Sequence, residues 1–301
     1  MISELNGPRP FEKIGNGELV LTAANSWTGL TTVRDGSLTF DGGSVALAAD
    51  FVVGDQTGDS GALIIENGGT VSNTLGYIGY DTGSTGAATV TGAGSSWTNS
   101  DDLFVGNAGN GTLTIADGGA VSNTDGGIGY GSGSTGAVTV TGAGSAWTNS
   151  DDLAVGYSGN GTLTIADGGA VSGLVGAVGF FPGVIGTVTV TGVGSTWTHS
   201  GLSVGYFGNG TLTIADGGAV SDEYGLIGAG SGSIGTVTIT GVGSRWANSG
   251  SLQVGNFGDG ALTIADGGTV SNTLGTIGAN SGSTSTVIVT GAGSTWNNSN
   301  G

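Results

Sequence analysis

Short segments in which apolar and polar residues alternate recur along the chain and are separated by glycine-rich turns. In residues 112–115, Leu113 and Ile115 fall on one face and Thr112 and Thr114 on the other, as in a half-buried β-strand. Three such segments occur in about every 25 residues. The pattern therefore predicts an all-β protein that is built from many short strands.

The segments belong to an internal repeat of about 50 residues that divides into two similar halves. A valine or isoleucine followed by glycine marks each half, and successive markers are 23 to 27 residues apart, alternating between short and long steps. The markers fall at positions 53, 78, 105, 128, 155, 178, 204, 227, 254 and 277. This period predicts a parallel β-helix (β-solenoid) of about 25 residues per coil and roughly 12 coils. A meander of antiparallel hairpins is the structural alternative, with residues 117–119 as a hairpin turn.

The regularity of the repeat divides the chain into three parts. Residues 1–10 are predicted to be an N-terminal extension, and residues 11–50 to form irregular N-terminal coils. Residues 51–301 are predicted to form a regular solenoid of about five double coils of 50 residues each.

In a solenoid, equivalent positions of successive coils stack, and the third strand gives a column in which valine and tryptophan alternate. We predict that this column lies in the core, because valine at every second level is typical of an inward-facing position. An exposed aromatic track for stacking against sugars is the alternative. The tryptophans of the column are Trp97, Trp147, Trp197, Trp246 and Trp296.

A second column lies two residues further along each coil and holds asparagine in seven of ten coils. Stacked asparagine side chains can hydrogen-bond along the long axis and can also bind the turn backbone. His199, the single histidine of the chain, replaces asparagine here, and we interpret it as a turn variant and not as a catalytic base or metal ligand. The structural asparagines include Asn73, Asn99, Asn123, Asn149, Asn248 and Asn272.

Composition narrows the classes of function. The 68 glycines among 301 residues, about three times the usual ~7%, supply the turns. With 22 acidic and four basic residues the formal net charge is −18, which argues against nucleic-acid binding and against docking on anionic lipid. Without cysteine, no disulfide or thiolate metal site can form. The most apolar window, 174–186, is short and broken by glycine, so we expect no direct membrane insertion by this chain.

Candidate chemistry is sparse. Asp117 and its equivalents precede two glycines, which is a turn signal, and calcium binding there is the alternative. The acidic pairs 101–102 and 151–152 are interpreted as solvated loops. We expect no cofactor, no metal and no catalytic residues. Where the repeat is broken, Phe180, Phe181 and Pro182 form a candidate contact bulge. A glycan-, calcium- or ice-binding module and a polysaccharide-degrading β-helix enzyme remain the alternatives to a passive scaffold.

The repeat can be named once it is written out. VGNAGNGTLTIADGGAVS (105–122) followed by GAVTVTGAGSAWTNS (136–150) resembles the repeat shared by passengers of bacterial autotransporters (type V secretion) and some PEP-CTERM surface proteins. GNGELVLTAANSWTGLTTVRDGSLTF (15–40) resembles the autotransporter-associated β-strand repeat. The resemblance implies a right-handed parallel β-helix that is exported and displayed on the cell surface, with its membrane anchor or barrel outside this sequence.

The resemblance also implies a role. We expect a non-catalytic stalk or scaffold for adhesion or for a cell-surface matrix. Its partners would be host or matrix glycans or proteins, or further copies of itself through end-to-end or lateral association.

Overall fold

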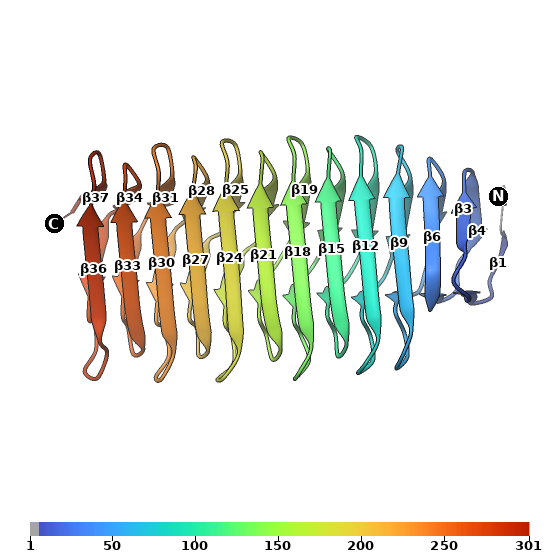
Figure 1. Cartoon of the computed structure of the whole chain (residues 1–301), viewed down its shortest axis with the longest axis horizontal. Helices are drawn as coiled ribbons and strands as arrows, with labels where there is room; N and C mark the ends of the chain where they lie inside the picture. Colours follow the sequence, from blue (N-terminus) through green and yellow to red (C-terminus); the bar gives the residue numbers. More distant parts are fainter. Residues whose placement is uncertain (1–5, 301) are drawn as a thin grey trace.

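The computed structural model describes residues 6–300, which form one elongated β-solenoid (Figure 1). Each strand pairs in parallel with the equivalent strand of the next coil, so the strands fall into three sheets that run along the molecule. The predicted all-β parallel solenoid is confirmed, and the alternative of a hairpin meander is wrong.

The tryptophan sheet, named for the tryptophans that it carries, holds the third strand of each coil. Its 13 strands are β1 (Asn6–Gly7), β4 (Ala24–Trp27), β7 (Ser44–Ala46), β10 (Thr70–Asn73), β13 (Ser96–Asn99), β16 (Ala120–Asn123), β19 (Ala146–Asn149), β22 (Ala170–Ser172), β25 (Thr196–Thr198), β28 (Ala219–Asp222), β31 (Arg245–Asn248), β34 (Thr269–Asn272) and β37 (Thr295–Asn298).

The marker sheet is named for its strands from β8 onward, which end in the valine or isoleucine of the valine-glycine or isoleucine-glycine marker. Its 12 strands are β2 (Phe11–Lys13), β5 (Thr31–Val33), β8 (Phe51–Val53), β11 (Gly76–Ile78), β14 (Leu103–Val105), β17 (Gly126–Ile128), β20 (Leu153–Val155), β23 (Val175–Val178), β26 (Gly201–Val204), β29 (Tyr224–Ile227), β32 (Ser251–Val254) and β35 (Leu274–Ile277).

The long-strand sheet holds the longest strand of each coil. Its 12 strands are β3 (Glu18–Leu21), β6 (Asp35–Asp41), β9 (Ser60–Glu66), β12 (Thr85–Thr91), β15 (Asn110–Ala116), β18 (Thr135–Thr141), β21 (Asn160–Ala166), β24 (Ile185–Thr191), β27 (Asn209–Ala215), β30 (Ile234–Thr240), β33 (Asp259–Ala265) and β36 (Ser285–Thr290).

The coils wind in a right-handed sense. In Figure 1 the arrows of the long-strand sheet point up at the front, the rest of each coil lies behind them, and successive coils advance from the N-terminus at the right to the C-terminus at the left. Eleven turns separate the first and last of the 12 strands of this sheet.

Coil length differs between the two ends of the chain. In the regular part, residues of the long strands that lie opposite each other are about 25 positions apart, as are Leu113 and Val138. Near the N-terminus, Val20 lies opposite Thr39, which is only 19 positions further along. The first coils are therefore shorter. Residues 1–5 of the predicted N-terminal extension lie outside the described residues.

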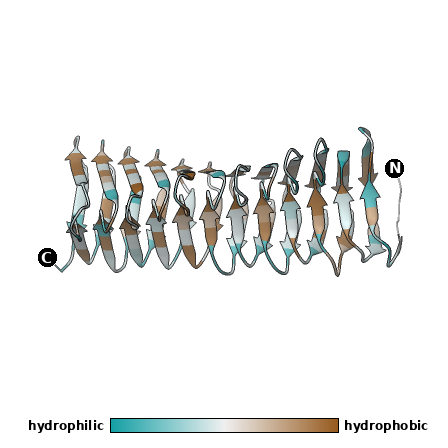
Figure 2. Cartoon of the chain, turned by 90° about the horizontal axis from the view of Figure 1, so that it is seen from below, coloured by the Kyte–Doolittle hydropathy of each residue, from teal (hydrophilic) through white to brown (hydrophobic). Residues whose placement is uncertain are grey.

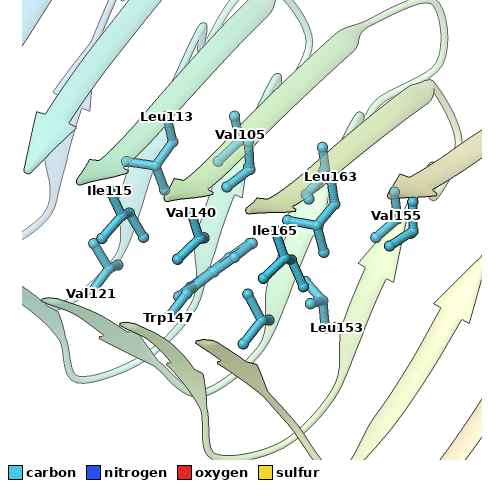
Figure 3. Close-up of a cluster of buried hydrophobic side chains, with 14 of the residues drawn as sticks. Val105, Leu113, Ile115, Val121, Val140, Trp147, Leu153, Val155, Leu163 and Ile165 are labelled. Atoms are coloured by element: carbon cyan, nitrogen blue, oxygen red, sulfur yellow. The ribbon is translucent and has the colours of Figure 1, made fainter. Parts of the chain in front are cut away.

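The core is a set of stacked columns of apolar side chains that the three sheets enclose. Figure 2 shows hydrophobic residues recurring at equivalent places in successive strands. In Figure 3, Leu113 and Ile115 from the long-strand sheet and Val121 and Trp147 from the tryptophan sheet point toward one another. Each of these side chains is at most 2% exposed. Alternation along each strand thus places one apolar face inside the solenoid.

From β15 onward, the turn after every second long strand is built on an aspartate in the left-handed backbone region. Asp117 has a φ of 51°, and Gly118 follows with a φ of 88°. The Asp117 carboxylate also accepts a hydrogen bond from the Thr91 hydroxyl of the preceding coil, at 3.3 Å. Aspartate tolerates this backbone region better than most residues, and glycine adopts it without strain. The repeated aspartates therefore act as turn residues.

Residues 6–300 include no helix that is long and apolar enough to cross a membrane.

Candidate functional site

The tryptophan column lies inside the solenoid. Trp97, Trp147, Trp197 and Trp246 are fully buried, and Trp296 in the last coil is half-buried. The indole N–H of Trp97 donates to Asn73 Oδ1 of the preceding coil at 2.6 Å. The same bond joins Trp147 to Asn123, and Trp296 to Asn272, also at 2.6 Å. The indoles therefore pack in the core and do not form an exposed track that could stack against sugars.

The asparagine column is connected in pairs of coils. The Asn73 amide donates to Asn99 Oδ1 at 2.7 Å, and the Asn123 amide donates to Asn149 Oδ1 at 2.6 Å. The Asn99 amide does not continue to Asn123 but donates to the backbone carbonyl of Ser122 at 3.4 Å. Each pair of asparagines therefore holds together a coil with valine and the following coil with tryptophan.

The asparagine column is interrupted in three successive coils, where Gly173, His199 and Asp222 replace asparagine, and Asn248 follows in the next coil. Gly173 has no side-chain acceptor, and Trp197 Nε1 has no hydrogen-bond partner among the described residues. Both ring nitrogens of His199, Asp222 Oδ1 and the amide of Asn248 are also buried without partners there. A hollow of about 430 Å³ borders these three side chains.

Burial shifts the pKa values of His199 and Asp222 and so controls their charge. It lowers the pKa of His199 to about 3, so the imidazole is neutral at pH 7 and packs edge-on against Trp197 with ring centroids 4.4 Å apart. Burial raises the pKa of Asp222 to about 7, although Trp246 Nε1 donates to Asp222 Oδ2 at 2.9 Å and opposes the shift. His199 is therefore a neutral imidazole that occupies the asparagine position by packing and makes none of the hydrogen bonds of asparagine with its ring nitrogens.

A groove of about 460 Å³ lies on the outer face of the marker sheet. Its floor is the middle, outward position of four consecutive strands, β17, β20, β23 and β26, where the side chains are small. These floor residues are Gly127, Ala154, Ala177 and Ser203. The groove follows the axis of the solenoid, because its floor residues lie opposite one another in consecutive coils.

One wall of the groove is a column of aromatic rings. Tyr130 and Tyr157 stack with centroids 4.8 Å apart and planes 8° apart. The stack continues through Phe180 at 4.8 Å and Tyr206 at 5.0 Å. On the other side of Tyr130 it continues to Phe104 at 4.3 Å and from Phe104 to Tyr77 at 5.5 Å. Because Tyr130, Tyr157 and Phe180 stack on one another's faces, this part of the column presents ring edges and tyrosine hydroxyls at its sides.

The opposite wall is acidic and consists of Asp102, Asp125 and Asp152, which precede strands β14, β17 and β20. Asp102 Oδ1 accepts the backbone N–H of Asp125 at 3.1 Å, and Asp125 Oδ1 accepts that of Asp152 at 2.8 Å. Burial raises the pKa of the Asp102 and Asp152 carboxyls, and the charge of Asp125 adds to both shifts. Carboxylate oxygens of Asp125, Asp151 and Asp152 also lie within 4.8 Å of one another.

The predicted contact bulge lies at this groove. Phe180 belongs to the aromatic column, while Phe181 packs edge-on against Tyr157 and Phe180 with centroids 5.0 Å from both. Phe181 is 41% exposed and Pro182 is exposed beside it. Phe180 thus belongs to the aromatic wall, and Phe181 packs against that wall.

Sequence reasoning missed the aromatic column as a whole. Its signal is the residue that follows the marker glycine, which is aromatic in coils that lie next to one another. The marker was interpreted only as a strand end and a turn. Of the acidic wall, Asp102 and Asp152 were interpreted as parts of two solvated loops, because each follows another aspartate in the sequence, and Asp125 was not singled out. The residues in question are Tyr130, Tyr157, Phe180 and Tyr206.

Fold and groove together define an elongated repeat scaffold with one hollowed face. Residues 11–40, which span β2 to β6, match the family model of the passenger-associated-transport-repeat. This match confirms the resemblance to autotransporter passenger repeats and supports a passenger scaffold. No curated protein matches the chain. A crystal structure of a TibC-catalyzed hyper-glycosylated TibA55-350 fragment aligns with 98% of this chain and 100% of that chain, at 17% identity and a TM-score of 0.41.

Proposed function

We propose that the chain is a non-catalytic part of an autotransporter passenger that is displayed at a bacterial cell surface and serves adhesion or a cell-surface matrix. The observation that carries this proposal is the unbroken stack of coils that starts in the matched repeat. The marker sheet runs from β2 inside residues 11–40 to β35, and each strand pairs with the next. Such a rod holds a binding face at a distance from its anchor.

The chemistry of the side chains supports a scaffold. Asp117 and its equivalents form turns, and His199 is buried and neutral at pH 7. The asparagine column binds indoles and backbone. These groups hold the coils together and need no cofactor. The proposal accordingly includes no catalytic step, no cofactor and no bound metal.

The negative charge of the chain is compatible with display at a cell surface beside other copies of the chain. A formal net charge of −18 keeps like rods apart at low ionic strength and attracts basic partners. We propose that the partners are host or matrix glycans or proteins, or other copies of the chain under conditions that screen the charge.

Display on living cells tests this function. The full chain is fused in front of an autotransporter translocation barrel in a Gram-negative host, and exposure is measured by protease accessibility on intact cells. We expect the chain to reach the surface folded, and cells displaying it to adhere to matrix-coated surfaces better than cells with the barrel alone. Val140→Asp, which buries a charge at a fully buried position, is the folding control.

Two results would contradict the proposal. The first is a chain that stays inside the cell while the barrel inserts. The second is cleavage of a polysaccharide by the purified chain, since the proposal contains no catalytic step.

A further inference from the structure

The groove on the outer face of the marker sheet is confined to four coils and is closed at both ends. Gly127 lies opposite Phe104 on one side, and Ser203 lies opposite Leu226 on the other. Between them the outward position carries only small side chains. Outward positions have no core to fit, so the fold does not require small residues there. The hollow is therefore a local feature of these coils and not a consequence of the repeat.

The acidic wall is also not required by the coil. The position that Asp102, Asp125 and Asp152 occupy is held by Val175 in the next coil and by Gly201 in the one after it. Both ion pairs found among residues 6–300 are made by Arg34, so none of the three carboxylates has a basic partner there. Three neighbouring carboxylates thus face an apolar hollow without a counter-charge.

The charge and the ring geometry decide between classes of ligand. Anionic polymers are repelled by the acidic wall and by the net charge of −18. A neutral glycan would find the ring faces covered, because Tyr130 and Tyr157 stack almost parallel at 8°. A lysine side chain fits both walls, since its methylene stem packs on the apolar floor and ring edges while its ammonium reaches a carboxylate.

We propose that this groove binds an extended, lysine-bearing segment of a basic partner protein. The inference rests on the proposed function, because it names the partner class of the displayed scaffold. The lysine stems lie over Ala154 and Ala177, and their ammonium groups bind Asp102, Asp125 and Asp152. The aromatic column limits the width of the groove and selects an extended chain over a folded surface.

Fluorescence anisotropy with the full chain and a labelled hexalysine peptide tests the proposal. We expect hexalysine to bind and added salt to weaken it, while hexaglutamate and a neutral glucose hexasaccharide do not bind. The triple variant D102N, D125N and D152N removes the acidic wall, yet each asparagine can still accept the N–H that the aspartate accepted. It should weaken hexalysine binding roughly tenfold or more.

The control triple D117N, D167N and D216N removes the same charge from turns outside the groove and should change affinity less than about twofold. A second variant, Ala154→Phe, fills the hollow and should also abolish binding, whereas Thr139→Phe on the long-strand sheet should not. Circular dichroism and thermal melting establish that each variant is folded.

Equal losses in the two aspartate triples would overturn the proposal, because binding would then follow net charge alone. Binding of the neutral hexasaccharide that Ala154→Phe abolishes would overturn it in favour of a glycan site. If hexalysine does not bind while displayed cells still adhere, this inference fails and the proposed function stands. If hexalysine binds as described but the chain never reaches the surface, the proposed function fails and the binding of basic segments stands.

Discussion

Two stretches of the tryptophan sheet carry the same apolar column and different polar ones. Between β10 and β19, the buried indoles of Trp97 and Trp147 each donate to an asparagine of the preceding coil. Between β22 and β31, Trp197 has no acceptor among the described residues, and Trp246 donates to Asp222 instead. Valine and tryptophan nevertheless alternate through both stretches, and the strands keep their register.

The difference shows which interactions hold the stack of coils together. Burying a large apolar side chain contributes about 1.5–3 kcal/mol or more, whereas one hydrogen bond contributes a net ~1 kcal/mol. Loss of the asparagine at Gly173 therefore leaves the stack intact. The cost falls on buried atoms such as Trp197 Nε1 and the ring nitrogens of His199, which lose water without gaining a partner.

Deleting an indole from each stretch gives the largest expected effect. Trp147→Ala should lower the free energy of unfolding by about 3–5 kcal/mol, because it opens a cavity and leaves Asn123 Oδ1 unpaired. Trp197→Ala opens a similar cavity but removes an indole N–H that had no partner, so it should cost about 1 kcal/mol less. Urea denaturation of both variants measures the difference, and equal losses would show that the hydrogen bond adds nothing.

The next largest effect is expected in how stability depends on pH, through Asp222 and His199 in the stretch between β22 and β31. Asp222 has a folded pKa of about 7 against an ordinary 3.8, so its contribution to stability is present below pH 3.8 and is lost as pH rises toward 7. His199 has a folded pKa of about 3 against 6.5, so its contribution is present above pH 6.5 and is lost as pH falls toward 3. The two groups therefore oppose each other in the native chain.

Single substitutions separate the contributions of Asp222 and His199 to the pH dependence of stability. His199→Asn leaves Asp222 alone and should make the chain less stable at pH 7 than at pH 4, by about 2–4 kcal/mol relative to the double variant with Asp222→Asn. Asp222→Asn leaves His199 alone and should reverse the sign of the pH dependence. Denaturant midpoints from pH 4 to pH 8 check both slopes, and slopes that match the double variant would refute the assignment.

Restoring the missing asparagine should convert the irregular stretch into a regular one. The variant Gly173→Asn with His199→Asn offers Trp197 an acceptor and re-creates the asparagine pair, so we expect a gain of about 1 kcal/mol. A Cβ at Gly173 would lie 3.1 Å from the Asp151 carbonyl, which must move slightly. Gly173→Ala with His199→Asn is the matched control, because it adds the Cβ without the acceptor and should give no gain.

The smallest effect is expected where a polar group is exposed and repeated. Asp117→Asn keeps an acceptor for Thr91 and a residue type that tolerates the left-handed turn, so the free energy of unfolding should change by less than about 0.5 kcal/mol. Thermal melting checks this value. A loss as large as that of a core substitution would mean that the turn, and not the core, limits stability.

Much of the fold could be predicted from the sequence because it depends on local alternation. The positions of Leu113 and Ile115 in the core follow from the period of a strand, and Gly118 follows from the turn that it permits. The groove could not be predicted in this way. Tyr130, Tyr157 and Phe180 each follow a marker glycine, but the sequence pattern does not show that their rings stack on one another, because that depends on how outward side chains of neighbouring coils are oriented.

The sequence by itself determined the period, the alternation of valine and tryptophan and the turns, because each depends on residue types within one coil. Only the tertiary structure decided which outward side chains meet. Register between coils brings Asp102, Asp125 and Asp152 to one wall and four small residues to one floor. It also leaves both ring nitrogens of His199 and Oδ1 of Asp222 buried without hydrogen-bond partners among the described residues. The physical reason is that stacking energy resides between coils, whereas the pattern of a single coil records only which side chains face inward.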